Sequence, residues 1–121
     1  MSKRVLFVVF DGTGLGHLQR IGRIAEAVQE SYASLVLTGM REAGWVIPDS
    51  CEIVSLPRWS RLRPPKASDQ GKSRWLAPED PIRESLRANL MSSVLRAYCP
   101  DALCVDYLPF GRKDELERVL A

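Results

Sequence analysis

The chain has 121 residues, of which 45% are hydrophobic and 26% charged, and its net charge is +2. These values are ordinary for a single globular domain, and the chain is long enough to bury a real hydrophobic core. So small a net charge gives no argument for nucleic acid binding, and no apolar run approaches the roughly 20 residues that span a bilayer. Cys51, Cys99 and Cys104 are odd in number and lack C-x-x-C spacing, so we expect free thiols in a reducing cytoplasm.

A strand, a glycine-rich turn and a helix open the chain. Six consecutive apolar residues, 5–10, predict a strand covered on both faces, which is typical of a parallel sheet. An acidic residue and glycines follow this short run, where a signal peptide would have its cleavage site, so we expect no secretion signal. The helix over residues 15–30 is predicted by apolar residues at helical spacing: Leu18, Ile21, Ile24, Ala25 and Val28.

Strands and helices then alternate along the rest of the chain. The predicted strands are 5–10, 34–38, 52–56 and 102–107, and the predicted helices are 15–30, 41–47, 81–99 and 113–120. The third helix is predicted from Pro81 at its first turn and from one apolar stripe: Ile82, Leu86, Leu90, Val94, Leu95 and Tyr98. This order predicts an α/β fold, a Rossmann-like doubly wound domain with a mostly parallel sheet of at least four strands. The fourth strand is expected at an edge of that sheet.

Residues 58–81 interrupt the alternation. They include four prolines and six basic residues, together with Trp59 and Trp75, and they show no sustained periodicity. Loops of this length in a compact domain are usually functional or disordered, and we predict a mobile basic loop over the site at the carboxyl ends of the strands. Its charge suits an anionic acceptor or an acidic membrane surface with the tryptophans as anchors. Nucleic acid binding is a further alternative that the small net charge does not favour, and a solvated linker with packed tryptophans is as good an interpretation.

The glycines after the first strand allow a sharp turn and bring backbone N–H groups close to a ligand. Known nucleotide-binding motifs fit this turn poorly. A P-loop needs a Lys-Ser/Thr pair after its second glycine, and no such pair follows Gly12. The dinucleotide fingerprint needs G-x-G-x-x-G and an acidic residue at the end of the second strand, whereas the chain has G-x-G-x-G and Thr38-Gly39.

The run from Asp11 to Arg20 resembles the amino-terminal turn of GT-B glycosyltransferases, in particular the bacterial group that includes the lipid-sugar enzyme of peptidoglycan synthesis and actinomycete natural-product transferases. Residues 21–28 are similar to the helical segment that follows this turn in that family. Residues 106–116 resemble a segment of a predicted glycosyltransferase subgroup. The resemblance implies that residues 1–121 form a single, truncated domain, the acceptor-side half of a GT-B fold.

The resemblance also implies a reaction in which an acceptor hydroxyl attacks the anomeric carbon of a nucleotide sugar. His17 would be the general base, because imidazole takes up a proton near neutral pH. Asp106, at the end of the fourth strand, would orient His17 or bind an acceptor hydroxyl. The residues expected to bind substrate are Gly12, Thr13, Gly14, Gly16, Arg20, Trp59 and Arg61. No metal or cofactor is expected, and transfer would need a separate half that binds the nucleotide sugar.

Simpler interpretations stay open for the same residues. His17 can be a histidine at a helix terminus whose role is limited to hydrogen bonds with the backbone. Asp106 can cap a turn, and Arg20 and Arg23 can belong to a solvated helix face. For the whole chain, the alternatives are a non-catalytic module that binds a glycoconjugate or another protein, and a piece of a longer enzyme. The expected partners are a donor-binding half or a second copy at the sheet edge, and peripheral membrane contact remains open for the basic loop.

Overall fold

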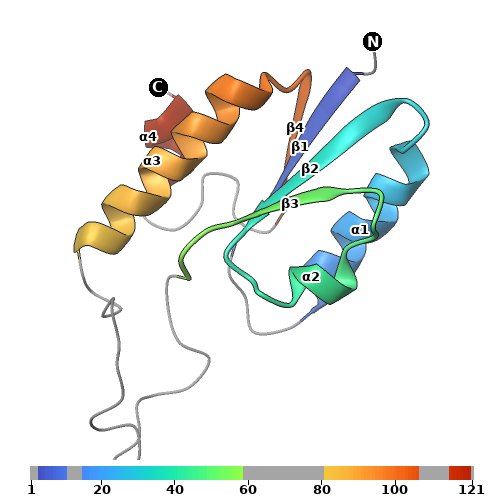
Figure 1. Ribbon diagram of the computed structural model, residues 1–121, viewed down its shortest axis with the longest axis horizontal. Helices are drawn as coiled ribbons and strands as arrows, with labels where there is room; N and C mark the ends of the chain where they lie inside the picture. Colours follow the sequence, from blue (N-terminus) through green and yellow to red (C-terminus); the bar gives the residue numbers. More distant parts are fainter. Residues whose placement is uncertain (1–2, 11–14, 59–80, 107–114, 121) are drawn as a thin grey trace, which may run out of the picture.

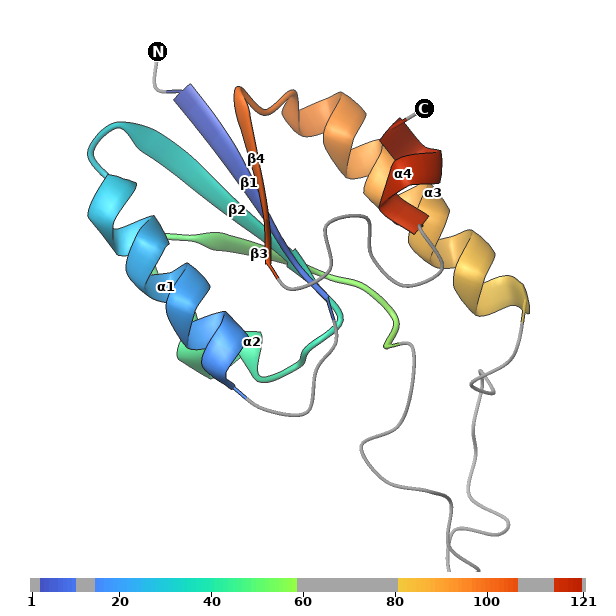
Figure 2. The ribbon, with the colours of Figure 1, turned by 180° about the vertical axis from the view of Figure 1, so that it is seen from behind.

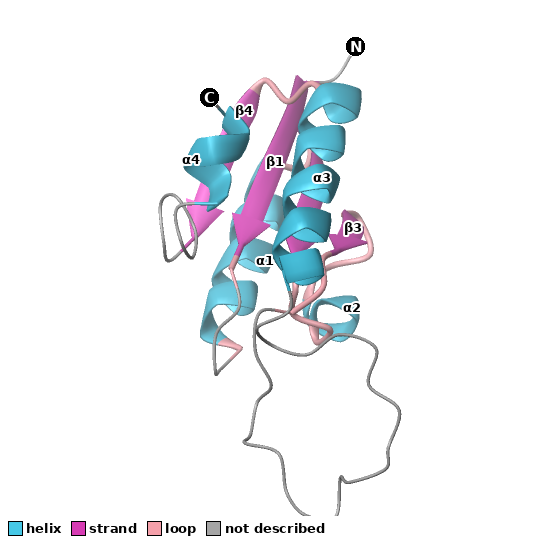
Figure 3. Cartoon of the chain, turned by 90° about the vertical axis from the view of Figure 1, so that its left-hand side faces the viewer, coloured by secondary structure: helices cyan, strands magenta, loops and turns pink. Residues whose placement is uncertain are grey.

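The computed structural model describes residues 3–10, 15–58, 81–106 and 115–120 (Figure 1). A parallel sheet of four strands in the order β3-β2-β1-β4 is its central element. The strands are β1 (Lys3–Val9), β2 (Tyr32–Thr38), β3 (Glu52–Ser55) and β4 (Ala102–Asp106). Figure 3 shows strand arrows that run in the same direction. The predicted α/β class and parallel sheet are confirmed, and β4 lies at an edge of the described sheet, as expected.

Helices cover both faces of this sheet (Figures 1 and 2). One face carries α1 (Gly16–Val28) and α2 (Ala43–Val46), and the other carries α3 (Pro81–Tyr98) and α4 (Glu115–Leu120). The chain places β2 and β3 on one side of β1, then returns through α3 and places β4 on the other side. The carboxyl ends of β1 and β4 are therefore neighbours at the point where the strand order reverses, which is where doubly wound folds bind their ligands.

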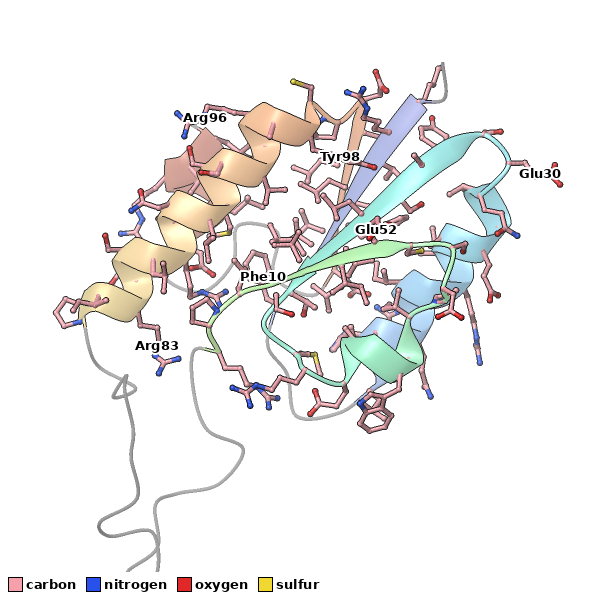
Figure 4. All side chains as sticks on the ribbon, in the orientation of Figure 1. Phe10, Glu30, Glu52, Arg83, Arg96 and Tyr98 are labelled. Carbon is pink, nitrogen blue, oxygen red and sulfur yellow. The ribbon has the colours of Figure 1, made fainter. Side chains whose placement is uncertain are left out.

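Strand β1 supplies both halves of the hydrophobic core, because its alternate side chains point to opposite faces of the sheet. The side chains on the α1 face are Val5, Phe7 and Val9. Those on the α3 face are Leu6, Val8 and Phe10, the last just beyond the strand. All six are at most 6% exposed, and Figure 4 shows Phe10 between α3 and the sheet. Burial of each contributes on the order of 1.5–3 kcal/mol. The prediction of a strand covered on both faces is confirmed.

The apolar face of α1 differs from the prediction at one position. Leu18, Ile21 and Ala25 are buried as expected, but Ile24 is 38% exposed. The reason is that α2 and the residues after it pack beside Gly22, where an added Cβ would lie 3.3 Å from Cδ of Pro48. This contact covers the Gly22 side of the helix and leaves the Ile24 side in water.

The apolar stripe predicted for α3 is wrong in its first two turns. Ile82 and Leu86 are 61% and 37% exposed, whereas Arg87 and Met91 are fully buried. The helix turns Arg87 inward because the guanidinium is paired with Glu115 at the start of α4. The last two turns do face the core as predicted, with Leu90, Val94, Leu95 and Tyr98 packed against it.

Tyr98 fastens the end of α3 to the sheet. Its hydroxyl lies 2.7 Å from the carbonyl oxygen of Ala33 in β2 and donates to it. Figure 4 shows the Tyr98 ring directed from α3 toward the strands. Burial raises the pKa of Tyr98, because the phenolate would lose solvation there, and the nearby Arg4 opposes this effect only in part.

Candidate functional site

His17 and Asp106 meet at the carboxyl ends of β1 and β4. The ring nitrogen Nδ1 of His17 lies 3.2 Å from Oδ1 of Asp106, although 89 residues separate the two in the chain. Asp106 is the last residue of β4, and Val9 of β1 is its register partner. Since α1 begins soon after β1 ends, the second residue of that helix is carried to the same place. The geometry thus brings together the two residues proposed as the catalytic pair.

The Asp106 carboxylate is nearly buried, with 7% of the residue exposed. A buried charge needs partners that donate hydrogen bonds, and within the described residues α1 supplies two of them. His17 is one of them, with a side chain that is 27% exposed. The carboxylate therefore belongs to a built polar contact between a strand end and a helix start, and the ring beside it can be reached by solvent.

Arg20 is the second donor to Asp106. Its Nη1 lies 3.0 Å from Oδ1 and 3.3 Å from Oδ2. A spacing of three residues places His17 and Arg20 on the same face of α1, so both side chains reach the same carboxylate. The Arg20 side chain is 61% exposed, whereas the carboxylate that it binds is 7% exposed. Arg20 is therefore more than a solvated surface residue, and Arg23, one turn further on, is exposed.

This arrangement assigns distinct roles to the two ring nitrogens of His17. An ionised carboxylate only accepts hydrogen bonds, so Nδ1 carries the proton and donates it to Oδ1 of Asp106. In the neutral ring the basic lone pair is then on Nε2. A histidine held in this way can take a proton from a substrate hydroxyl while the carboxylate stabilises the imidazolium that forms.

The remaining residues expected to bind substrate are placed only in part. Gly16 begins α1, and a Cβ added there would meet no atom within 4 Å, so packing in the described structure does not require a glycine. Of the basic loop, Arg58 is described and forms an ion pair with Glu42, with Nη2 3.7 Å from Oε2. Residues 59–80 of the loop lie outside the described residues. So do the other residues expected to bind substrate: Gly12, Thr13, Gly14, Trp59 and Arg61.

A second pair of charged residues, Arg87 and Glu115, is not predicted by the sequence pattern. Their side chains are 0% and 1% exposed. Nη2 of Arg87 lies 2.7 Å from Oε1 of Glu115, and Nε lies 3.1 Å from Oε2. Nη1 of Arg87 also donates to the carbonyl oxygen of Pro57, just beyond β3. The spacing of apolar residues gives no signal of this pair, because it assigns every charged residue to the exposed face of a helix.

The cysteines do not add a nucleophile to the site. All three are free thiols, as expected. Burial raises the pKa of the Cys51 and Cys104 thiols, which keeps them protonated and weakly nucleophilic near neutral pH. Within the described ranges, no group of three His, Cys, Asp or Glu side chains is placed to hold a metal ion.

Comparison with models of known protein families finds no match, and comparison with curated proteins finds none either. The geometry around His17 and the sequence resemblance of that segment are therefore the features from which a function can be inferred.

Proposed function

We propose that this chain forms the acceptor-binding side of a glycosyl transfer site, with His17 as the general base. The observation that carries the proposal is the hydrogen bond between Nδ1 of His17 and Oδ1 of Asp106 at the carboxyl ends of β1 and β4. This is the position at which doubly wound folds hold their ligands. The resemblance of the residues around His17 to the GT-B turn supports the choice of reaction.

The proposed step moves one proton and exchanges one bond. Nε2 of His17 takes the proton of an acceptor hydroxyl, and the hydroxyl oxygen forms a bond to the anomeric carbon of a nucleotide sugar. The bond from that carbon to the nucleoside diphosphate breaks, and its electron pair leaves with the diphosphate. Asp106 stabilises the imidazolium of His17 and holds the ring in place.

The donor would be bound by a separate half, in another chain or another domain. We propose the β4 edge as its docking place, because β4 ends the described sheet and Leu103 on it is 38% exposed. The three free thiols favour a reducing cytoplasm as the place of action. In the parts of the chain that the structure describes, no helix combines the length and apolarity needed to cross a membrane.

The first test uses the fact that His17 is the only histidine. Its ring nitrogens give one set of ¹⁵N NMR signals, which can be followed while glycosides and detergent-solubilised glycolipids are added. We expect a saturable shift with at least one hydroxyl-bearing acceptor and none with UDP-, dTDP- or GDP-sugars alone. A panel of acceptors that leaves His17 unchanged would contradict the proposal. Saturable binding of a nucleotide sugar would place the donor site in this chain instead.

The second test separates transfer from binding alone. Release of nucleoside diphosphate is measured with the bound acceptor, the three nucleotide sugars and a donor-binding chain, for the natural protein and for His17→Gln. The proposed base predicts that His17→Gln lowers the rate by about 10²–10⁴-fold, the usual contribution of general base catalysis. Acceptor binding without any transfer would support the alternative, a non-catalytic glycoconjugate-binding module.

A further inference from the structure

Arg20 fixes the orientation of the Asp106 carboxylate. The terminal torsion of an aspartate side chain is broad, so the plane of the carboxylate is not set by its own rotamer. In this structure Nη1 of Arg20 lies within hydrogen-bond distance of both oxygens, at 3.0 and 3.3 Å. That contact holds the plane so that Oδ1 faces Nδ1 of His17, 3.2 Å away.

Arg20 also supplies the charge that this carboxylate needs. A guanidinium is positively charged at every pH at which proteins fold, and it stabilises an ionised carboxylate through charge-assisted hydrogen bonds. Asp106 is 7% exposed, so water contributes little of that stabilisation. Because the ionised carboxylate only accepts, the proton between the two residues belongs to Nδ1 of His17.

We propose that Arg20 is a positioning residue that sets the tautomer of His17 through Asp106. Arg20 holds the carboxylate in its orientation, the carboxylate accepts the hydrogen bond from Nδ1, and the lone pair of the neutral ring is thereby kept on Nε2. The consequence for glycosyl transfer rests on the proposed function. The effect on the tautomer does not, and it is present without any substrate.

The competing role for Arg20 is direct binding of an anionic substrate group, since its side chain is 61% exposed. The two roles differ in what they change. Loss of a positioning residue alters the tautomer of His17 in the unliganded protein and lowers kcat. Loss of an anion contact leaves the tautomer unchanged and raises KM for anionic acceptors only.

The test compares Arg20→Gln and Arg20→Lys with Arg23→Gln, which removes the same charge from an exposed position on the same helix. The ¹⁵N shifts of the His17 ring report the tautomer at a pH where the ring is neutral, and a backbone ¹H–¹⁵N spectrum checks the fold. The natural protein and Arg23→Gln should show the Nδ1–H form. Arg20→Gln should raise the ratio of Nε2–H to Nδ1–H by about fivefold, the effect of one hydrogen bond. Arg20→Lys, which keeps the charge, should restore part of the difference.

Asp106→Asn makes the two possible failures distinguishable. If Asp106→Asn changes the tautomer and Arg20→Gln does not, the positioning role of Arg20 is wrong and the His17–Asp106 bond stands. If neither substitution changes it, the charge of the Asp106 carboxylate does not fix the proton on Nδ1, and the proton assignment behind the proposed function is itself wrong. A rise in KM for anionic acceptors in Arg20→Gln with an unchanged tautomer would assign Arg20 to substrate binding and overturn the proposal.

Discussion

Arg87 of α3 and Glu115 of α4 form a bidentate ion pair from which water is almost completely excluded, since their side chains are 0% and 1% exposed. The guanidinium also donates to the carbonyl oxygen of Pro57, so one side chain joins two helices and the segment after β3. Transfer of an ion from water into a protein interior costs several kcal/mol, and the pairing offsets this cost only while both partners are present.

The first prediction concerns this pair. Arg87→Met or Glu115→Leu alone removes one member of this buried ion pair and keeps the other charge, and each should lower the free energy of unfolding by about 3–5 kcal/mol. The double variant removes both charges and should recover most of that loss. Urea denaturation of the four proteins measures the coupling. Arg118→Ala is the control, because its pair with Glu84 is 56% and 35% exposed and should contribute less than about 1 kcal/mol. Additive losses in the double variant would show that the two charges do not depend on each other.

The second prediction concerns the contact between α1 and α2. A side chain at Gly22 would press against Cδ of Pro48 at 3.3 Å and the carbonyl oxygen of Val46 at 3.6 Å. Gly22→Leu should therefore lower the free energy of unfolding by about 1–3 kcal/mol, as overpacking does. Ala27→Leu places the same side chain at an exposed position of the same helix and should change stability little. Equal stability of the two variants in urea would show that α2 does not need the space at Gly22.

The third prediction separates packing from ligand contact at Gly16. Among the residues that the structure describes, none has an atom within 4 Å of a Cβ at this position, apart from the neighbours in the chain and the helix's own backbone. Gly16→Ala should therefore keep or raise the thermal midpoint, because alanine adds at most about 1 kcal/mol of helix propensity to the free energy of unfolding. If the backbone there contacts an acceptor, the added methyl group should weaken the acceptor-induced shift of the His17 signals. Calorimetry and the NMR titration measure the two effects on one sample. An unchanged titration in Gly16→Ala would remove Gly16 from the substrate-binding residues.

The sequence predicts those parts of the fold that local periodicity determines. The side chains of residues 5–10 point alternately to the two faces of the sheet, and all six are apolar. A continuous apolar run of this kind is enough to identify a strand between two helical layers. Periodicity does not say which helix packs beside another, so it placed Ile24 in the core although α2 lies on the Gly22 side. It also treats every charged residue as surface, and for that reason it misplaced the buried face of α3 at Arg87.

The candidate site was predictable for a different reason. In a parallel sheet the carboxyl ends of neighbouring strands share one edge, so a polar residue ending one strand lies near the helix that follows its neighbour. His17 and Asp106 satisfy that rule once β4 is placed beside β1. The bond from Arg20 to the same carboxylate depends on the side-chain reach and on the rotation of the carboxylate, and neither is encoded in residue type or spacing.

The last prediction concerns alkaline pH and the partly buried side chain of Tyr98. Its pKa is raised in the folded protein, from an ordinary value of 10.0, chiefly because burial penalises the phenolate. The unfolded chain therefore loses this proton at a lower pH than the folded chain does, and the resulting stabilisation is fully present below about pH 10 and is lost as the pH rises through the folded pKa. At pH 7, Tyr98→Phe should cost about 1 kcal/mol, the usual net value of the hydrogen bond to Ala33.

Above pH 10 the natural protein should lose stability faster than Tyr98→Phe, so that the difference between the two shrinks. Urea denaturation between pH 7 and about pH 11 measures both curves, and the effect of the Cys51 and Cys104 thiols, whose pKa values are also raised, largely cancels in the comparison. Tyr32→Phe is the matched control on β2, because it removes a phenol hydroxyl and leaves that of Tyr98 in place. A constant difference between the natural protein and Tyr98→Phe across this range would show that the hydroxyl of Tyr98 ionises as readily in the folded chain as in the unfolded one. The hydrogen bond that fastens α3 to β2 would then be open to water.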